Sequence, residues 1–321
     1  MSDKPVLLIP RKLSARTLER AARDYDVRVN LEDQVYTPAK LLAKCQDVDA
    51  VLPCHSEHFS ADMVARLPDR LKIIANHSVG VDHCDLKACK DRGIIVTNTP
   101  DVLSDATAEI AMLLLLGAAR RASEGDRMMR NGEWKHWSPS FMVGSHVTGK
   151  TLGIIGMGRV GQAMARCACG FNIDIHYYNR SRLSPEKELG ATYHDTVESV
   201  LAVSNFLSLH CPATPETTGL LNAQRIGLMP DGAVVVNTAR GALIDEPALI
   251  AALKSGKLAA AGLDVFAKEP GGNPAFAELE NIFMLPHIGS ATFETRDAMG
   301  FRALDNIDAY FAGKQPGDRV A

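Results

Sequence analysis

The sequence lacks a long hydrophobic run. Its longest apolar stretch, IAMLLLLGAA at residues 110–119, has ten residues, whereas a helix that spans a membrane needs about 20. The N-terminus, MSDKPVLLIP, has neither the apolar segment nor the cleavage site of a signal peptide. We therefore expect no membrane partner, a buried helix at residues 110–119, and a cytoplasmic protein.

The sequence also has little excess charge and no pair of CxxC motifs. Its 35 Lys and Arg residues nearly balance its 38 Asp and Glu residues, so that the formal net charge is −3. This balance gives no reason to expect a nucleic-acid partner. The seven cysteines are scattered and odd in number. We therefore expect reduced thiols and no metal site.

Short apolar, β-branched runs alternate with longer segments that have helical spacing. The expected strands are PVLLI, DAVLP, LKIIANHS and GIIVTN before residue 100, and TLGIIG, IDIHYYN, NFLSLHC, AVVVNTA, AAGLDVF and NIFMLPH after residue 150. Strands that alternate with helices predict an α/β fold with parallel sheets covered by helices on both faces. At about 150 residues per domain, 321 residues suggest two domains.

We place the dinucleotide-binding domain, a Rossmann-type doubly wound parallel sheet, at residues 101–287. Residues 1–100 and 288–321 are expected to form a smaller, flavodoxin-like α/β domain that binds the substrate. Asp105 or Thr107 can cap the long helix at the boundary. The segment FETRDAMGFRALDNIDAYFAG predicts one terminal helix that returns to the first domain.

The segment TLGIIGMGRVGQAMARCACGF is typical of a strand, a glycine-rich turn and a helix. In this motif the first glycine permits the tight turn, the second lets the backbone approach a pyrophosphate, and the third lets the helix pack on the strand. Here these glycines are Gly156, Gly158 and Gly161. The N–H groups of Arg159 and Val160 would face the anion. Because a second strand follows at the right distance, we predict a dinucleotide site rather than a glycine-rich turn without a ligand.

The second strand ends in NRSR, where NAD-binding domains usually carry an Asp or Glu that binds the ribose. Asn179 removes the carboxylate that would repel a 2′-phosphate by about 4 kcal/mol at a separation of about 4 Å. Arg180 and Arg182 can donate charge-assisted hydrogen bonds to that phosphate, and Ser181 can add a hydroxyl. We therefore expect NADP(H) to be preferred and NAD(H) to remain possible, unless the arginines merely solvate a strand end.

Three polar residues follow three of the expected strands. Arg240 lies in VVVNTARGALID, Glu269 in GLDVFAKEP, and His287 in MLPHIGSAT. Ligands of open parallel sheets bind at the carboxyl ends of the strands, so the three can converge. His287 can donate the proton that carbonyl reduction requires, and Glu269 can orient and stabilise its imidazolium. Arg240 can bind a carboxylate and polarise the adjacent carbonyl.

The segments GMGRVGQAMA, NTARGALIDEPAL, AGLDVFAKEP and LPHIGSAT resemble, in this order, those of the D-isomer-specific 2-hydroxyacid dehydrogenases. The resemblance covers essentially the whole chain. It implies the roles given above for Arg240, Glu269 and His287, and backbone N–H groups of Val79 and Gly80 that hold the substrate carboxylate. It also implies a substrate contact by Ser290. The further cofactor contacts that it implies are Thr107, Cys211, Pro212, Thr217, Thr238, Asp264 and Gly289.

Within that family the chain is most similar to the glyoxylate/hydroxypyruvate reductases. The segment GEWKHWSPSFMVG resembles their segment that reaches into the partner subunit's active site, with Trp137 as the reaching residue, so a homodimer is expected. The alternative is that Trp134 and Trp137 only pack the interface. Two functions remain as rivals to reduction of a small 2-oxo acid. They are a 2-ketogluconate-type reductase and a non-enzymatic, dinucleotide-sensing corepressor.

Overall fold

The computed structural model describes residues 4–321 and divides into two compact units. One unit combines the described residues up to Leu103 with Ser290–Ala321, and the other is Ser104–Gly289. Each unit is built around a parallel sheet, which confirms the predicted α/β class. Among the described residues, no helix combines the length and the apolar composition that crossing a membrane requires. All seven cysteines are free thiols.

The discontinuous unit has a five-stranded sheet in the order β2-β1-β3-β4-β5, with every pair of neighbours parallel. Its strands are β1 (Val6–Ile9), β2 (Asp26–Val29), β3 (Ala50–Val51), β4 (Ile73–Ala75) and β5 (Ile95–Thr97). Its helices are α1 (Ala15–Asp24), α2 (Pro38–Cys45), α3 (Ala61–Ala65), α4 (Leu86–Asp91) and α12 (Phe293–Phe311). The strand order reverses between β1 and β3, as in flavodoxin-like sheets.

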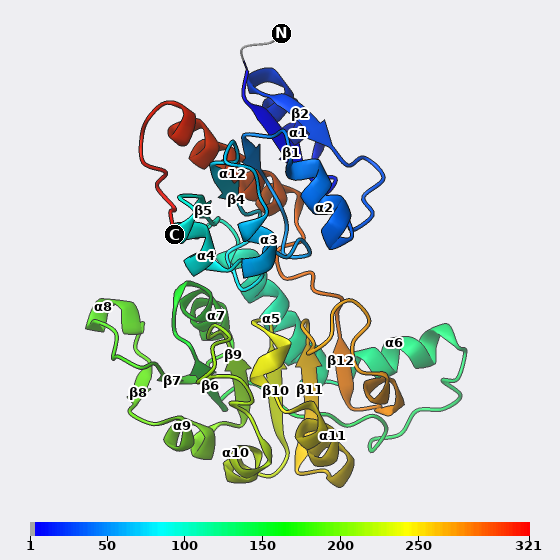
Figure 1. The fold of residues 1–321 in the computed structure, drawn as a ribbon. Coiled ribbons are helices and arrows are strands. Elements are labelled where there is room, and N and C mark those ends of the chain that lie inside the picture. The colour runs from blue at the N-terminus through cyan, green and yellow to red at the C-terminus, as the bar shows by residue number, and fades with distance from the viewer. Residues whose placement is uncertain (1–3) are drawn as a thin grey trace. The chain divides into compact units, whose positions relative to one another are not determined.

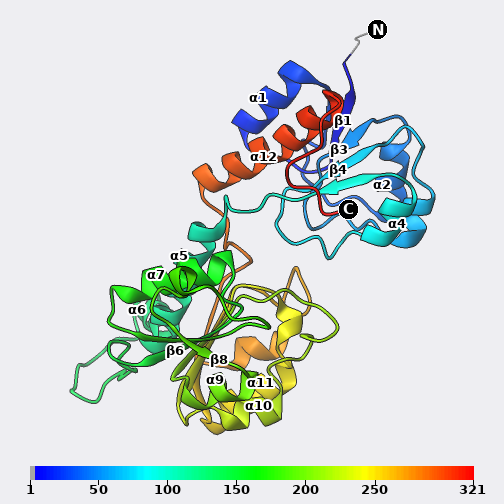
Figure 2. The same cartoon turned by 90° about the vertical axis from the view of Figure 1, so that its left-hand side faces the viewer.

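The terminal helix α12 is part of the core of this unit. It lies beside α1 (Figure 2) and against β4. Its buried residues Ala303, Leu304 and Ile307 pack with Leu7 and Ile73 of the sheet. Helices α2, α3 and α4 contribute to the core on the other face. The helix expected near the end of the sequence is therefore present and returns to the first sheet.

The second unit has a seven-stranded parallel sheet in the order β12-β11-β10-β9-β6-β7-β8. Its strands are β6 (Thr151–Ile155), β7 (Asp174–Tyr178), β8 (Thr192–His194), β9 (Phe206–Leu209), β10 (Ala233–Asn237), β11 (Leu258–Leu263) and β12 (Ile282–Met284). The sequence order reverses between β6 and β9, and the crevice at such a switch point is where doubly wound sheets bind their ligands.

Two layers of helices cover this sheet (Figure 1). The layers contain α5 (Ser104–Ala119) and α7 (Arg159–Cys169) on one face, and α9 (Val197–Val203), α10 (Ala223–Leu228) and α11 (Glu246–Ser255) on the other. The shorter or peripheral helices are α6 (Ala122–Arg130), α8 (Pro185–Glu188), η1 (Gly241–Leu243) and η2 (Pro274–Glu278).

Helix α5 contains the apolar stretch at residues 110–119, and most of its side chains are buried. It begins at Ser104, which is earlier than the sequence suggested. The prediction that Asp105 or Thr107 caps it is therefore wrong. Asp105 lies in its first turn and Thr107 is buried within it. Other helices begin with a side-chain cap: Ser14, Thr37 and Asp245 accept hydrogen bonds from N–H groups of the first turns of α1, α2 and α11.

The close approach of α12 to α1 depends on Gly300. A Cβ at this position would lie 2.1 Å from Oγ1 of Thr17, a fully buried residue of α1. Gly300→Ala should therefore lower the free energy of unfolding by about 1–3 kcal/mol, the usual cost of overpacking a core. Urea unfolding followed by circular dichroism measures this change.

In the matched control, Gly227→Ala in α10, the new Cβ meets nothing within 4 Å. This control should leave stability unchanged or raise it by up to about 1 kcal/mol. Equal midpoints for Gly300→Ala and the wild type would contradict the packing argument.

Candidate active site

The glycine-rich turn between β6 and α7 has the geometry that a pyrophosphate requires. Gly156 has a φ of +96°, and a Cβ there would lie 2.4 Å from the backbone nitrogen of Cys211. A Cβ on Gly161 would lie 2.4 Å from the carbonyl oxygen of Gly156, whereas one on Gly158 would meet nothing within 4 Å. The backbone is thus close-packed at the first and third glycines and open at the second.

Helix α7 begins at Arg159 after Gly158, and no side chain caps its first turn. The N–H groups at the start of a helix attract anions, since they are unpaired donors at the positive end of the helix dipole. The open space at Gly158 and this uncapped helix start together fit a dinucleotide pyrophosphate. Arg159 is exposed and Val160 is half-buried at the same turn.

The segment after β7 lies beside this turn. Oδ1 of Asn179 accepts a hydrogen bond of 2.7 Å from the N–H of Met157, inside the glycine-rich loop. Arg180 and Ser181 are exposed. The pKa of Glu216 is lowered, first by a hydrogen bond with Thr214 and, as a smaller cause, by the positive charge of Arg180.

The two arginines of this segment have different surroundings. Arg182 donates from Nε and Nη2 to the carboxylate of Glu188 at 2.7 and 3.1 Å. Its charge is therefore already matched by an acidic partner within the protein. The sequence pattern treated Arg180 and Arg182 alike, and the structure distinguishes them.

The other residues that we expected along the cofactor all belong to the unit Ser104–Gly289. Cys211 and Pro212 follow β9, and the Thr217 hydroxyl closes their loop by donating to the carbonyl oxygen of Pro212 at 2.7 Å. Thr238 follows β10 and is nearly buried. Thr107 of α5 is close to Gly289, where a Cβ would come within 3.4 Å of its methyl group.

The structure joins two of the three residues predicted to carry the chemistry. Nδ1 of His287, just beyond β12, lies 2.6 Å from Oε2 of Glu269, which follows β11. The other carboxylate oxygen, Oε1, accepts a hydrogen bond of 2.8 Å from the N–H of Phe266. Both side chains are partly exposed, 32% for His287 and 24% for Glu269. The pair is thus fixed in orientation while remaining open to a ligand.

Arg240 follows β10 in a loop that the sequence did not explain. Asn237, fully buried at the end of β10, accepts a hydrogen bond from the N–H of Ala239 and donates one of 2.8 Å to the carbonyl oxygen of Arg240. Asn237 therefore shapes the backbone that carries Arg240. Sequence reasoning missed it, although a polar residue that ends the buried run AVVV is a signal for such a role.

Asp264 lies at the end of β11 and is 1% exposed. Its carboxylate accepts hydrogen bonds from the N–H groups of Ile288 and Gly289, at 2.8 and 2.7 Å. Burial raises the pKa of this carboxyl, and the two hydrogen bonds oppose the rise. Asp264, predicted only as a cofactor contact, thus anchors the turn that follows His287.

The predicted substrate loop lies in the other unit. Asn98 donates to the carbonyl oxygen of Val79, and the Ser78 hydroxyl donates to that of Gly80. In residues 4–321, the N–H groups of Val79 and Gly80 donate no hydrogen bond of their own. The chain re-enters this unit at Ser290, which is half-buried.

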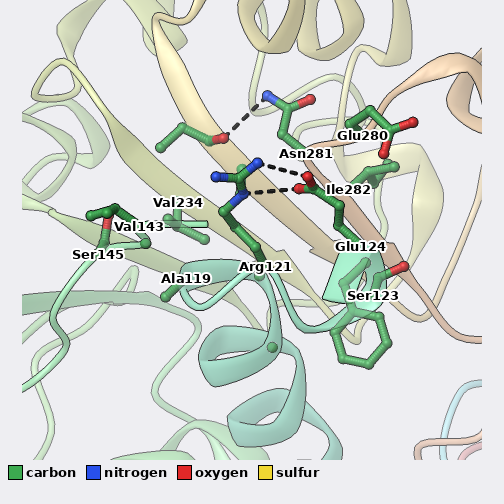
Figure 3. A pocket seen from close by; sticks show the side chains of 16 residues that line it. Ala119, Arg121, Ser123, Glu124, Val143, Ser145, Val234, Glu280, Asn281 and Ile282 are labelled. Atoms are coloured by element: carbon green, nitrogen blue, oxygen red, sulfur yellow. Dashed lines mark hydrogen bonds and ion pairs between the residues drawn. The ribbon is translucent and has the colours of Figure 1, made fainter. Parts of the chain in front are cut away.

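One hollow of the second unit lies away from these residues, at the other end of the strands. It has a volume of about 400 Å³ and is lined by the beginnings of β10, β11 and β12 and by the segments at Arg121 and Val143. Figure 3 shows the guanidinium of Arg121 facing the carboxylate of Glu124, with two hydrogen bonds of 2.8 and 2.7 Å. Because ligands of such sheets bind at the carboxyl ends of the strands, this hollow is not the active site.

The segment beside this hollow is unusually exposed. Helix α6 has no buried residue, and Figure 1 shows it next to β12. In the segment that follows, Trp134, Trp137 and Val143 are 51%, 73% and 64% exposed. Trp137, predicted to reach a partner subunit, therefore packs little within its own chain.

Comparison with known proteins agrees with this geometry. Residues 112–289 match the family model "D-isomer specific 2-hydroxyacid dehydrogenase, NAD binding domain". The chain is 46% identical to a glycerate dehydrogenase from Hyphomicrobium methylovorum, with 97% of each chain covered. It is 45% identical to a glyoxylate reductase from Pyrococcus furiosus, with 98% of this chain and 94% of that protein covered.

A solved structure with the same architecture is the NADPH-dependent glyoxylate/hydroxypyruvate reductase from Sinorhizobium meliloti in complex with NADP and malonate. It superposes with a TM-score of 0.87 at 32% identity, covering 99% of this chain and 97% of that one. The dinucleotide turn, the histidine–carboxylate pair beyond the adjacent strands and these whole-length similarities lead to one conclusion: the chain belongs to the D-isomer specific 2-hydroxyacid dehydrogenase family.

Proposed function

We propose that this protein reduces a small 2-oxo acid, glyoxylate or hydroxypyruvate, to the corresponding 2-hydroxy acid, with NADPH as the preferred cofactor. The observation that carries the chemistry is the 2.6 Å hydrogen bond between His287 and Glu269 beyond a dinucleotide-binding sheet. The names of the similar glyoxylate reductase and glyoxylate/hydroxypyruvate reductase support the substrate class. The free thiols suit a reducing compartment such as the cytoplasm.

His287 is proposed as the general acid. Its Nδ1–H donates to the Glu269 carboxylate, and this hydrogen bond orients the ring. Nε2 lies on the opposite side of the imidazole and is the atom that we propose donates to the substrate. Bound NADPH would supply the hydride that converts the carbonyl into an alkoxide. The imidazolium of His287 gives this oxygen its proton, and the negative charge of Glu269 stabilises the imidazolium until it does so.

A 2-oxo acid also needs cations or N–H groups for its carboxylate. Arg240 supplies a guanidinium that can bind the carboxylate and polarise the neighbouring carbonyl. In the other unit, the N–H groups of Val79 and Gly80 offer two donors of the type that binds carboxylates in backbone nests. We propose these three residues and Ser290 as the groups that bind substrate.

The preference for NADPH rests on the segment after β7. Asn179 has no negative charge, and the exposed Arg180 lies beside it. A guanidinium at this position can donate charge-assisted hydrogen bonds to a 2′-phosphate, and Ser181 can add a hydroxyl. Arg182 contributes less directly, because Glu188 already accepts its hydrogen bonds.

We also propose a homodimer in which a second copy covers α6 and the segment with Trp134 and Trp137. Helix α6 has no buried residue, and Trp134 and Trp137 are both more than half exposed. The start of α6 also lines the hollow at Arg121, through Ser123 and Glu124 (Figure 3). Aromatic residues are enriched in protein interfaces, and a second copy would bury these rings.

A substrate series tests the function. NADPH oxidation is measured with glyoxylate, hydroxypyruvate, pyruvate and 2-ketogluconate. We expect the highest kcat/KM with glyoxylate or hydroxypyruvate. A preference for 2-ketogluconate would point to a reductase with a larger pocket, and no turnover with any 2-oxo acid would favour a dinucleotide-sensing binding protein.

Within the same assay, His287→Ala should lower kcat by about 10²–10⁴-fold, because it removes the general acid. The Kd for NADPH, measured by fluorescence titration, should stay within about twofold, since His287 does not hold the dinucleotide in this proposal. The control is His146→Ala, which removes an exposed histidine of the same unit. Near-wild-type turnover of His287→Ala would reject the role.

Arg180→Ala should lower kcat/KM for NADPH by about 10–100-fold, the usual effect of losing hydrogen bonds to a charged group. The value for NADH should change by less than about threefold, because NADH has no 2′-phosphate. The control Lys187→Ala removes an exposed positive charge seven residues away. An equal loss with both cofactors would show that Arg180 does not distinguish them.

The double variant Trp134→Ala/Trp137→Ala should shift the protein from dimer to monomer in sedimentation velocity at micromolar concentration, because aromatic anchors supply much of an interface's energy. Leu31→Ala, at a 67% exposed residue of the other unit, is the control and should leave the dimer intact. A wild-type protein that sediments as a monomer, or a double variant that stays dimeric, would contradict the proposed interface.

A further inference from the structure

The segment between β7 and α8 is held at both ends by buried groups. At its start, Oδ1 of Asn179 accepts the N–H of Met157 at 2.7 Å. At its end, the N–H of Leu183 donates to the hydroxyl of Tyr177 at 3.0 Å, and Tyr177 is fully buried in β7. Arg180 and Ser181 therefore form the apex of a short loop whose two ends are fixed.

Glu188 completes the fixed end of this loop. The Tyr177 hydroxyl donates to its Oε1 at 2.8 Å, and Arg182 donates to both of its oxygens, at 2.7 and 3.1 Å. These hydrogen bonds lower the pKa of Glu188, and the bond from Arg182 is the larger cause. The carboxylate is therefore ionised near neutral pH. Arg182 also lies over the ring of Tyr193 in the neighbouring strand β8, at 5.7 Å.

The burial of Glu188 is unusual for a glutamate. Glu188 is 7% exposed and is the one buried residue of the single-turn helix α8. A helix that buries no apolar side chain has little hydrophobic energy to hold it in place, whereas a bidentate pair between Arg and a carboxylate has a defined direction. The carboxylate of Glu188, rather than packing, is therefore the contact by which α8 holds the loop.

We propose that Glu188 is a positioning residue that sets cofactor selectivity. Through Arg182 and Tyr177 it fixes the end of the loop, so that Arg180 and Ser181 are presented to the ribose. Arg182 then has a structural role, because its guanidinium is bound to Glu188. Of the two arginines, only Arg180 binds the 2′-phosphate. This inference rests on the NADPH preference proposed above and adds a buried residue to its cause.

The test compares Glu188→Gln with Glu186→Gln. Both variants remove one negative charge from α8, but Glu186 is exposed, and the pKa of its carboxyl is lowered by hydrogen bonds with Ser184 and with its own backbone. Glu188→Gln should raise KM for NADPH by about tenfold, on the scale of one charge-assisted hydrogen bond, while kcat and KM for NADH stay within about twofold. Glu186→Gln should leave all of these values unchanged.

Arg182 supplies the second arm. Arg182→Ala alone should raise KM for NADPH as Glu188→Gln does, and the double variant should be no worse than either single one, because both changes break the same contact. If Arg182→Ala still weakens NADPH in the Glu188→Gln background as strongly as in the wild type, Arg182 binds the phosphate itself and the proposal is overturned. An equal rise of KM for both cofactors in Glu188→Gln would also overturn it, since it would indicate general damage to the unit.

Hydrogen exchange separates this inference from the proposal on which it rests. In Glu188→Gln, the amides of residues 180–183 should exchange faster than in the wild type and in Glu186→Gln. Unchanged exchange would reject Glu188 as the group that holds the loop. If the wild type has equal kcat/KM for NADPH and NADH, the NADPH preference itself is rejected. The exchange data then decide alone whether Glu188 positions the loop. If the wild type prefers NADPH and Glu188→Gln keeps that preference, only the inference about Glu188 is rejected.

Discussion

The geometry of the proposed active site depends on one buried carboxylate, that of Asp264. Its two oxygens accept the N–H groups of Ile288 and Gly289, and its main-chain oxygen accepts the N–H of His287 at 2.9 Å. These three bonds hold His287 at a φ of +54°, a left-handed conformation that costs a non-glycine residue about 1–3 kcal/mol. In that conformation its imidazole meets Glu269. The acid is therefore oriented by the backbone of its own turn as much as by its carboxylate partner.

Most of the fold could be predicted because burial on both faces gives parallel strands a continuous apolar sequence. All ten expected strands are present, including β6 before the glycine-rich turn and β10. The sequence reasoning missed β2 and β8. Each lies at an edge of its sheet and is only partly buried, and TYH and DVRV carry polar residues that mask any apolar run.

The residues of the site were predictable where chemistry limits the choice, as for His287 and Glu269, whose hydrogen bond the structure shows. Their supports were not. These supports are Asn237, Asp264 and Glu188. Each acts through hydrogen bonds to backbone groups or to an arginine. Which groups become its hydrogen-bond partners depends on how the turns fold. Glu188 is six residues from Arg182 and looks like an ordinary surface glutamate in SPEKELG. The structure shows that it is buried and that Tyr177 and Arg182 donate to its carboxylate.

The return of α12 to the first sheet has a consequence for how the chain folds during its synthesis. The unit that leaves the ribosome first cannot complete its core until the last thirty or so residues follow, because Ala303, Leu304 and Ile307 fill one face of its sheet. The continuous unit Ser104–Gly289 has all of its strands earlier and can fold as a whole before then. In the nascent chain, the apolar face of β1 and β4 therefore stays uncovered for the longest time, and it is the surface that a chaperone would meet.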